Sequence, residues 1–312
     1  MPTLRHDDYT VGWICALPLE MAAAKAMLDE IHEDLPVQPN DHNAYTLGRI
    51  GKHNVAIACL PSGVYGIAST STVAMHLLSS FRSVKFGLLV GIGGGIPSEE
   101  VDIRLGDVVV GLPSSASTNG RVVQYDLGKA IQESEFKRKG SLNRPPQILA
   151  TAVSKLQAKH RMENSRIPEF VLEMRTKWPK MRDVYVGVRP RDRLFEAEYL
   201  HPGGNLSCAD CDPDRLIDRP NRAIKDPMIH YGLIASGNTV IKDSGVRDRL
   251  GRELGAYCVE MEAAGVANDY PCLVVRGICD YADSHKNKAW QGRAAAAAAA
   301  YAKELLLVTS DS

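Results

Sequence analysis

The sequence predicts an α/β fold, with a three-layer α/β/α arrangement, a central mixed and largely parallel sheet, and a helical insertion. Two observations carry this prediction. Short, continuously apolar runs alternate with helical patterns, as in sheets that are covered on both faces. The chain of 312 residues is 45% hydrophobic and 24% charged, a composition typical of globular proteins.

The expected elements follow in chain order. An apolar run at residues 9–17, ended by Pro18, predicts a first strand, and a helix follows from Leu19 to about Ile31. The next elements are a strand at 55–59, a helix at 70–80, strands at 86–91, 107–111 and 122–125, and two last strands at 229–236 and 272–278. Seven alanines, residues 294–300, predict a closing helix because alanine is the best helix former.

Residues 128–228 are richer in charge and proline, and helices are expected there at about 146–160 and 167–177. We interpret this segment as an insertion in a single domain that covers residues 1–312. Its Cys208 and Cys211 resemble half a zinc site, with His201 and His230 near in sequence. Because no second cysteine pair follows, we expect two packed thiols and no metal.

Charge and cysteine content restrict the classes of partner. Lys+Arg and Asp+Glu both number 37, so no bulk field favours nucleic acid or a membrane. The chain has no run of 18 apolar residues and no signal-peptide core. Its seven cysteines lie mostly in apolar runs, which indicates reduced thiols and a cytoplasmic location. Nothing in the sequence indicates a cofactor.

Acidic residues follow predicted strands at several points. Glu260 and Glu262 open a stretch of small residues that we read as a helix, and Asp280 follows the apolar strand at 272–278. Since ligands in α/β sheets bind beyond strand ends, the segment predicts a polar ligand between two carboxylates, one accepting hydrogen bonds and one supplying a proton. The alternative is that these acids, like Glu20 after the first strand, only cap helices or complement helix dipoles.

Glycines gather at residues 91–95, after the strand at 86–91. Such a cluster can cradle a phosphate or simply form a tight turn. It lacks the spacing of the dinucleotide fingerprint and the Lys-Ser/Thr of a P-loop.

Two motifs in combination, Val259-Glu260-Met261-Glu262-Ala263 and Cys279-Asp280-Tyr281-Ala282-Asp283, closely resemble the nucleoside phosphorylase/nucleosidase superfamily. The chain is similar to methylthioadenosine/adenosylhomocysteine nucleosidases and to the phosphorylase-like domains of filamentous fungi over about residues 9–127 and 229–308. The resemblance implies three catalytic residues. Glu262 accepts both ribose hydroxyls, Asp280 protonates purine N7, and Glu20 positions the attacking water.

The resemblance also implies a set of substrate-binding residues around the sugar and the purine. They are Gly91, Gly93, Gly94, Tyr125, Asp126, Ser236, Asn238, Val240, Glu260, Met261 and Cys279. Cys279 stands where the superfamily usually has serine, and Val240 stands where an aromatic residue stacks on the base.

One departure of this sequence from the phosphorylase pattern favours hydrolysis over phosphorolysis. Hexameric phosphorylases read Arg-Val-Gly-Ser where this chain has Leu89-Val90-Gly91-Ile92. A dehydrated phosphate needs charge-assisted donors, so their loss, with Glu20 nearby, favours water as the nucleophile.

The sequence therefore predicts a purine nucleosidase that hydrolyses the N-glycosidic bond of adenosine, with inosine and other purine nucleosides left open, and that forms a homodimer. The alternatives are a phosphate-dependent purine nucleoside phosphorylase, a nucleotide-sensing domain, and an ATP N-glycosidase in which Arg189, Arg191 and Arg193 meet the triphosphate. Whether the chain is a stand-alone enzyme or part of a larger protein is also open.

Overall fold

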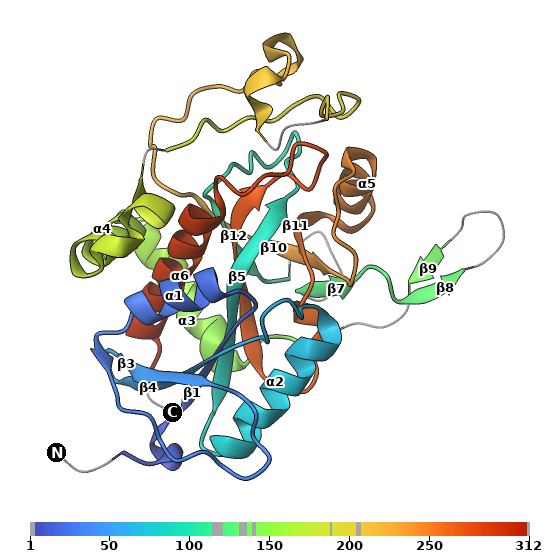
Figure 1. Cartoon of the computed structure of the whole chain (residues 1–312). Helices are drawn as coiled ribbons and strands as arrows, with labels where there is room; N and C mark the ends of the chain where they lie inside the picture. The colour runs from blue at the N-terminus through green and yellow to red at the C-terminus, as the bar shows by residue number, and fades with distance from the viewer. Residues whose placement is uncertain are drawn as a thin grey trace.

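A mixed sheet forms the centre of the computed structural model, which describes residues 4–113, 121–130, 136–138, 142–187, 189–203 and 207–310. The strand order is β11-β10-β6-β12-β5-β1-β4-β3-β2, and β7 pairs beside β10 (Figure 1). The strands are β1 Val11–Cys15, β2 Glu30–Ile31, β3 Tyr45–Ile50, β4 His53–Cys59, β5 Phe86–Gly95, β6 Val108–Gly111, β7 Val122–Gln124, β10 Ile229–Ser236, β11 Ala256–Glu260 and β12 Cys272–Asp280. A separate hairpin joins β8 Gly128–Ala130 and β9 Phe136–Arg138. The predicted α/β class with a mixed sheet is confirmed.

The parallel strands β4, β1, β5 and β12 form the middle of this sheet. Every residue of β12 is buried, as expected for a strand covered on both faces. Beyond β12 the sheet continues through β6, β10 and β11. Strand β11 then pairs antiparallel with β5. Strands β5, β12, β6, β10 and β11 therefore form a closed ring. The sequence did not predict this closure, which depends on distant pairings.

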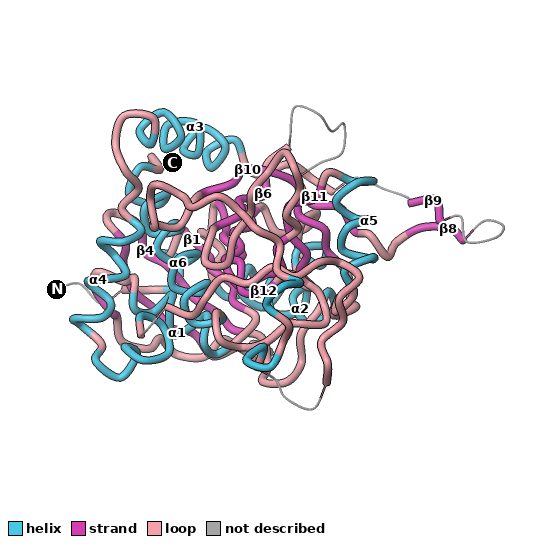
Figure 2. Tube along the Cα trace, turned by 90° about the horizontal axis from the view of Figure 1, so that it is seen from above, coloured by secondary structure: helices cyan, strands magenta, loops and turns pink. Residues whose placement is uncertain are grey.

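Helices cover the sheet on both faces (Figures 1 and 2). They are α1 Pro18–Ala26, α2 Ile67–Ser80, α3 Gln147–His160, α4 Ile167–Lys177, α5 Ser244–Leu254 and α6 Gln291–Val308. Helices α1, α3, α4 and α6 share one hydrophobic cluster with the central strands, α2 contributes to a second, and α5 packs in a third with β10 and β11. Short turns lie at His6–Asp8, Pro179–Met181, Arg182–Val186, Cys208–Asp210, Pro213–Arg215 and Ala263–Gly265. Among the described residues, no helix is long and apolar enough to cross a membrane.

The alanine-rich helix α6 packs unusually close to β12. All seven of its consecutive alanines, residues 294–300, are buried, and a Cβ built on Gly277 would lie 1.9 Å from the carbonyl oxygen of Ala294. Small side chains on both elements make this approach sterically possible. The predicted closing helix is confirmed.

Two sequence-based expectations about local structure were wrong, and some strands were missed. The glycine cluster is not a turn, because β5 continues to Gly95. Glu260 does not open a helix but ends β11, and the helical structure that follows it before β12 is the three-residue turn Ala263–Gly265. Strands β2 and β3 were not predicted. Pairing with neighbouring strands supplied the hydrogen bonds that local propensity did not indicate.

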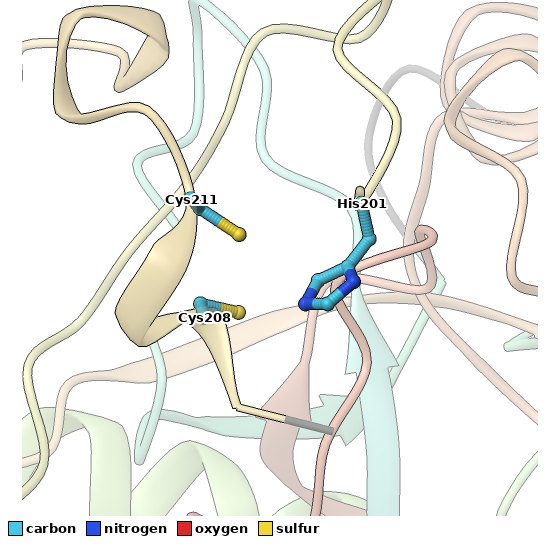
Figure 3. A group of neighbouring side chains, drawn as sticks. All are labelled: His201, Cys208 and Cys211. Atoms are coloured by element: carbon cyan, nitrogen blue, oxygen red, sulfur yellow. The ribbon is translucent and has the colours of Figure 1, made fainter. Parts of the chain in front are cut away.

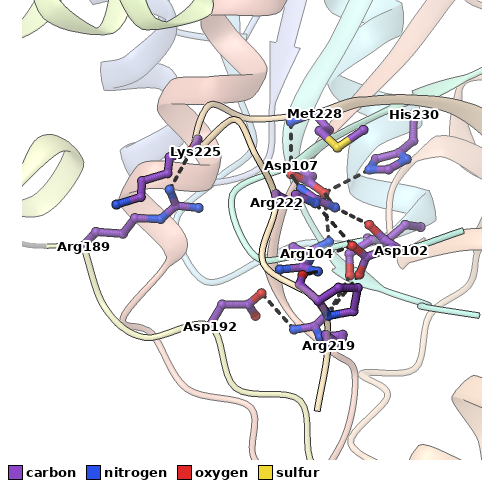
Figure 4. Close-up of polar contacts among 12 residues, drawn as sticks. Asp102, Arg104, Asp107, Arg189, Asp192, Arg219, Arg222, Lys225, Met228 and His230 are labelled. Carbon is purple, nitrogen blue, oxygen red and sulfur yellow. Dashed lines mark hydrogen bonds and ion pairs between the residues drawn. The ribbon is translucent and has the colours of Figure 1, made fainter. Parts of the chain in front are cut away.

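Polar contacts fasten the segment 217–228 to the main sheet (Figure 4). Asp107 accepts hydrogen bonds from Arg222 at 2.8 Å and from the backbone N–H of Met228 at 3.0 Å, and it pairs with His230 at 2.9 Å. Burial alone raises the pKa of Asp107, but His230 and Arg222 lower it overall. His230, considered above as a possible metal ligand, is thus engaged with a carboxylate.

Candidate active site

The ring of strands brings the two acidic motifs to one place. Val259 in β11 and Asp280 in β12 both pair with Gly94 of β5, from opposite sides. Two strand spacings, about 10 Å, therefore separate their backbones. Glu260 follows Val259 directly and Glu262 lies two residues further on, so the two acidic motifs, twenty residues apart in sequence, lie on either side of Gly94.

Four buried charged side chains form the centre of this site: Glu20, Glu260, Glu262 and Arg276. Arg276 lies in β12 with 0% exposure. Its Nη2 donates to Glu260 and, at 3.4 Å, to Glu262. Burial lowers the pKa of Arg276, but the surrounding carboxylates raise it overall, so the guanidinium stays protonated. Its Nε and Nη1 are also buried and have no hydrogen-bond partner within the described residues.

Glu20 enters the site from the first turn of α1. Its Oε2 accepts hydrogen bonds from the backbone N–H groups of Ala16 at 2.7 Å and Leu17 at 2.9 Å. Its Oε1 accepts one from the N–H of Ile92 at 2.8 Å. Burial raises the pKa of Glu20, and Arg276 and these three donors oppose that effect. The carboxylate is thus fixed between α1 and β5.

The two glutamates of the Glu-Met-Glu motif have different partners. Glu260 accepts hydrogen bonds from Arg276 and from the backbone N–H groups of Glu262 and Ala263. In the described structure Glu262 has only longer contacts, 3.4 Å to Arg276 Nη2 and 3.3 Å to the N–H of Met261. Burial raises the pKa of Glu262 to about 7, although Arg276 opposes this. Glu260 therefore holds Arg276 and the turn, while Glu262 retains oxygen lone pairs for a ligand.

The glycines of β5 let these side chains cross the strand. A Cβ on Gly91 would lie 2.3 Å from Arg276 Nη1 and 2.6 Å from Glu20 Oε1, and a Cβ on Gly94 would lie 2.9 Å from Asp280 Oδ1. A Cβ on Gly93 would lie 3.0 Å from the carbonyl oxygen of Val259. The cluster provides space for charged side chains of neighbouring elements rather than a turn.

Asp280 is the last residue of β12 and is 4% exposed. Its Oδ1 accepts a hydrogen bond from the N–H of Ala282 at 2.9 Å. Its Oδ2 lies 3.0 Å from Cys279 Sγ and 3.2 Å from Lys286 Nζ. Burial lowers the pKa of Lys286, but Asp280 raises it overall. The Cys279 thiol thus contacts Asp280, and Lys286 adds a cation that the sequence did not indicate.

Ser236 lies at the end of β10, opposite Glu260 of β11. Its side chain is buried and accepts a hydrogen bond from the N–H of Ala264 at 3.0 Å. It therefore supports the turn that carries Glu262. Val240, four residues further on, is 46% exposed.

Tyr125 and Asp126 hold the loop between Ser236 and Val240. Asp126 accepts a hydrogen bond from the N–H of Asn238 at 2.8 Å, and the hydroxyl of Tyr125 donates to the backbone of this loop at 2.9 Å. Asn238 Oδ1 in turn accepts from the first N–H of α2 at 3.1 Å. These three residues form one connected group beside the Glu-Met-Glu turn.

A cavity of about 630 Å³ adjoins Asp280. Its lining carries five cationic side chains and two carboxylates, the latter being Asp280 and Asp283. The cations are Arg191, Arg193, Lys242, Lys286 and Lys288. Arg189, grouped with Arg191 and Arg193 from the sequence, instead donates to the backbone of Lys225 at 2.6 Å and lies over the ring of Trp290.

Sequence reasoning missed Arg276 and Lys286. Arg276 carried a recognisable signal, since it is the single charged residue of the otherwise apolar run at 272–278, and a buried charge in such a strand needs partners. Lys286 carried no local signal, because the fold alone brings it to Asp280.

Comparisons with known proteins bear on the superfamily and on the fold. Residues 185–307 match the family model of the phosphorylase superfamily. A 5'-methylthioadenosine/S-adenosylhomocysteine nucleosidase of Helicobacter pylori has a similar structure, with a TM-score of 0.58 and 17% sequence identity over 96% of this chain and 97% of that one. The resemblance to the nucleoside phosphorylase/nucleosidase superfamily is thereby confirmed, and the fold is that of its nucleosidases.

Three relatives illustrate the range of proteins whose sequences are similar to this chain. A nucleotide-binding leucine-rich repeat (NLR)-like protein of Hyaloscypha variabilis is 46% identical over 99% of this chain, which spans only 30% of that protein's length. A 5'-methylthioadenosine/S-adenosylhomocysteine nucleosidase of Mycobacterium bovis is 27% identical over 88% of the chain and 86% of its own length. The ATP nucleosidase Cap17 of Escherichia coli is 24% identical over 92% of the chain and 48% of its length. Two of these three relatives are named as nucleosidases.

Proposed function

We propose that the protein hydrolyses the N-glycosidic bond of a purine nucleoside, with adenosine as the substrate and water as the nucleophile. The observation that carries the proposal is that the Glu-Met-Glu motif after β11 and Asp280 of β12 lie on opposite sides of β5, while Arg276 reaches from β12 to Glu262. The distance of about 10 Å between the backbones on either side of β5 suits a nucleoside, whose sugar and base present different groups at its two ends.

In this proposal Asp280 acts on the purine. The leaving base must gain a proton at N7 as the bond to the sugar breaks, and a buried carboxylic acid is suited to this general-acid role. Lys286 and Cys279 hold one oxygen of Asp280, and Ala282 holds the other. The side chain is therefore oriented before the substrate arrives.

Glu262 acts on the sugar. Its carboxylate has lone pairs available for both ribose hydroxyls, and its negative charge stabilises the cationic character that the ribose develops at the transition state. Because its pKa is raised to about 7, kcat/KM should increase with pH through this region as the carboxylate ionises.

Two features favour water over phosphate. The backbone N–H of Ile92, at the position of the phosphorylase hydroxyl residue, already donates to Glu20. The buried cluster also contains three carboxylates and one guanidinium, so it repels a dianion that has lost its hydration. Glu20 and the unpaired donors of Arg276 instead suit a neutral water molecule.

A second candidate substrate is ATP, favoured by the cavity beside Asp280. Arg191, Lys242 and Lys288 line it together with Lys286 and Arg193, and clustered cations bind phosphate groups through charge-assisted hydrogen bonds. The similarity to an ATP nucleosidase points the same way. If ATP is the substrate, Arg191→Met should raise KM for ATP and leave KM for adenosine unchanged.

The deciding experiment incubates the protein with adenosine, inosine, methylthioadenosine and ATP, each with and without phosphate, and follows the released base by chromatography. The proposal expects base and free ribose, or ribose phosphates from ATP, without any need for phosphate. Strict phosphate dependence with ribose 1-phosphate as product would identify a phosphorylase. Failure to cleave any of the four substrates would leave a nucleotide-sensing role, which binding of the same compounds by calorimetry would test.

We also propose that the protein forms a homodimer, which covers the exposed apolar side chains Val64, Tyr65 and Met75 around the start of α2. Sedimentation velocity across a range of concentrations tests this. A fully active monomer would contradict it.

A further inference from the structure

Three potential metal-binding side chains meet outside the candidate active site. The ring of His201 and the sulfur atoms of Cys208 and Cys211 point into one space (Figure 3). Their ligand atoms all lie within 4.8 Å of one another. Both cysteines are buried, and all seven cysteines of the chain are free thiols.

The surrounding segment has little structure of its own. In the described part of residues 189–219, regular structure consists of two three-residue turns, Cys208–Asp210 and Pro213–Arg215, and a bridge between Phe195 and Leu216. Its hydrophobic cluster contains only three buried residues, Phe195 and the two cysteines. Units with so small a core commonly depend on a disulfide or a bound metal for stability.

We propose that His201, Cys208 and Cys211 bind one Zn²⁺ ion. Two sulfurs and one imidazole form a Cys₂His ligand set, and they leave one tetrahedral position for water. In such a site Zn–S bonds of about 2.3 Å place the ligand atoms about 3.7 Å apart. Since no two ligand atoms are more than 4.8 Å apart here, small side-chain rotations complete the geometry.

The contacts of the ligands allow this rearrangement. His201 Nδ1 accepts a hydrogen bond from the N–H of Gly203 at 3.2 Å, and Nε2 lies 3.3 Å from the carbonyl oxygen of Ser207. Both distances are long for hydrogen bonds, so coordination costs the ring only long contacts. A metal-bound neutral imidazole carries its proton on the other nitrogen. Coordination through Nδ1 therefore keeps the contact of Nε2–H with the Ser207 carbonyl, as is usual for histidine ligands, whereas coordination through Nε2 gives up both contacts.

The zinc site would shape the cavity beside Asp280. Cys208 and Ser207 belong to the lining of that cavity, and Cys208 Sγ contacts the backbone carbonyl of His285 at 3.7 Å. His285 lies five residues after Asp280 and one before Lys286. A metal at Cys208 therefore fastens the segment 189–219 to the loop that carries Lys286, and it supports the cation-rich wall.

The test measures metal binding rather than activity. The full chain is purified under reducing conditions without chelator, and its zinc content is measured by plasma mass spectrometry. We expect about one zinc per chain. After removal of zinc, titration with Co²⁺ should give thiolate-to-cobalt charge-transfer absorption and the visible bands of tetrahedral cobalt, with saturation at one equivalent.

Matched cysteine variants locate the site. Cys208→Ser and Cys211→Ser should each lose stoichiometric metal and the charge-transfer band, whereas Cys59→Ser, which alters a half-buried cysteine of β4, should retain both. The Co²⁺ titration of the unaltered protein remains decisive if a variant does not fold. Absence of stoichiometric metal in the reduced wild-type protein, a cobalt spectrum without thiolate ligands, or a Cys208–Cys211 disulfide that persists in reductant would each overturn the proposal.

Discussion

Replacing Glu262 by glutamine should remove activity and stabilise the fold at the same time. Glu262 is buried, and its pKa is raised to about 7 from the 4.5 of an exposed glutamate. Each pKa unit corresponds to about 1.4 kcal/mol, so ionising this side chain costs the folded protein about 3 kcal/mol at pH 8. Glutamine has the same shape and carries no charge, so it avoids that cost.

The sign of the pH dependence follows from the raised pKa. The folded state binds the proton of Glu262 more tightly than the unfolded state does. Protonation of Glu262 therefore stabilises the folded state fully below pH 4.5, and this contribution is lost as pH rises through about 7. Glu262→Gln and the wild-type protein should therefore differ by less than about 1 kcal/mol at pH 5. At pH 8 the variant should be more stable by about 3 kcal/mol, or about 5 °C in Tm.

Urea unfolding at the two pH values measures the stability, and base release measures the activity. The loss of kcat/KM should be on the order of 10²–10³, as for other groups that stabilise charge in a transition state. Glu260→Gln is the matched control. Because Glu260 pairs closely with Arg276, its replacement should instead destabilise the protein by about 3 kcal/mol. If Glu262→Gln destabilises at pH 8 as Glu260→Gln does, or retains wild-type activity, the reasoning about Glu262 is refuted.

Three further predictions concern other parts of the molecule. Asp280→Asn should reduce kcat for adenosine by roughly 10²–10⁴ but have much less effect on p-nitrophenyl riboside, whose leaving group needs no protonation; equal losses on both substrates would make Asp280 a structural residue. Asp107→Asn should destabilise the fold by about 3 kcal/mol at pH 7. Because the pKa of Asp107 is lowered, the difference should disappear in acid unfolding as pH falls below about 4. Gly277→Val should prevent α6 from packing, because even a Cβ would lie 1.9 Å from the Ala294 carbonyl oxygen. Gly245→Ala in α5 is its control, since the nearest atom there is a side-chain oxygen at 3.2 Å, and circular dichroism with thermal melting should show folded protein only for the control.

The sequence determined the elements whose own residues specify them. The apolar runs that became β1, β10 and β12 need burial on both faces, and the alanines of α6 favour a helix in any context. The helices expected at about 146–160 and 167–177 match α3 and α4 closely, since their patterns are local. The two acidic motifs also indicated the resemblance to the superfamily from the sequence alone, because their combination is specific.

Tertiary structure alone decided how these elements combine into a site. The antiparallel pairing of β11 with β5 closes the ring and brings Glu260 and Asp280 to either side of Gly94. No local pattern encodes this pairing, because strand partners are chosen by distant contacts. Distant contacts likewise place Lys286 beside Asp280 and His201 beside the two cysteines. Electrostatic effects depend on burial and on the distance between charges, so the raised pKa of Glu262 and the pairing of Arg276 became visible only once the chain was folded.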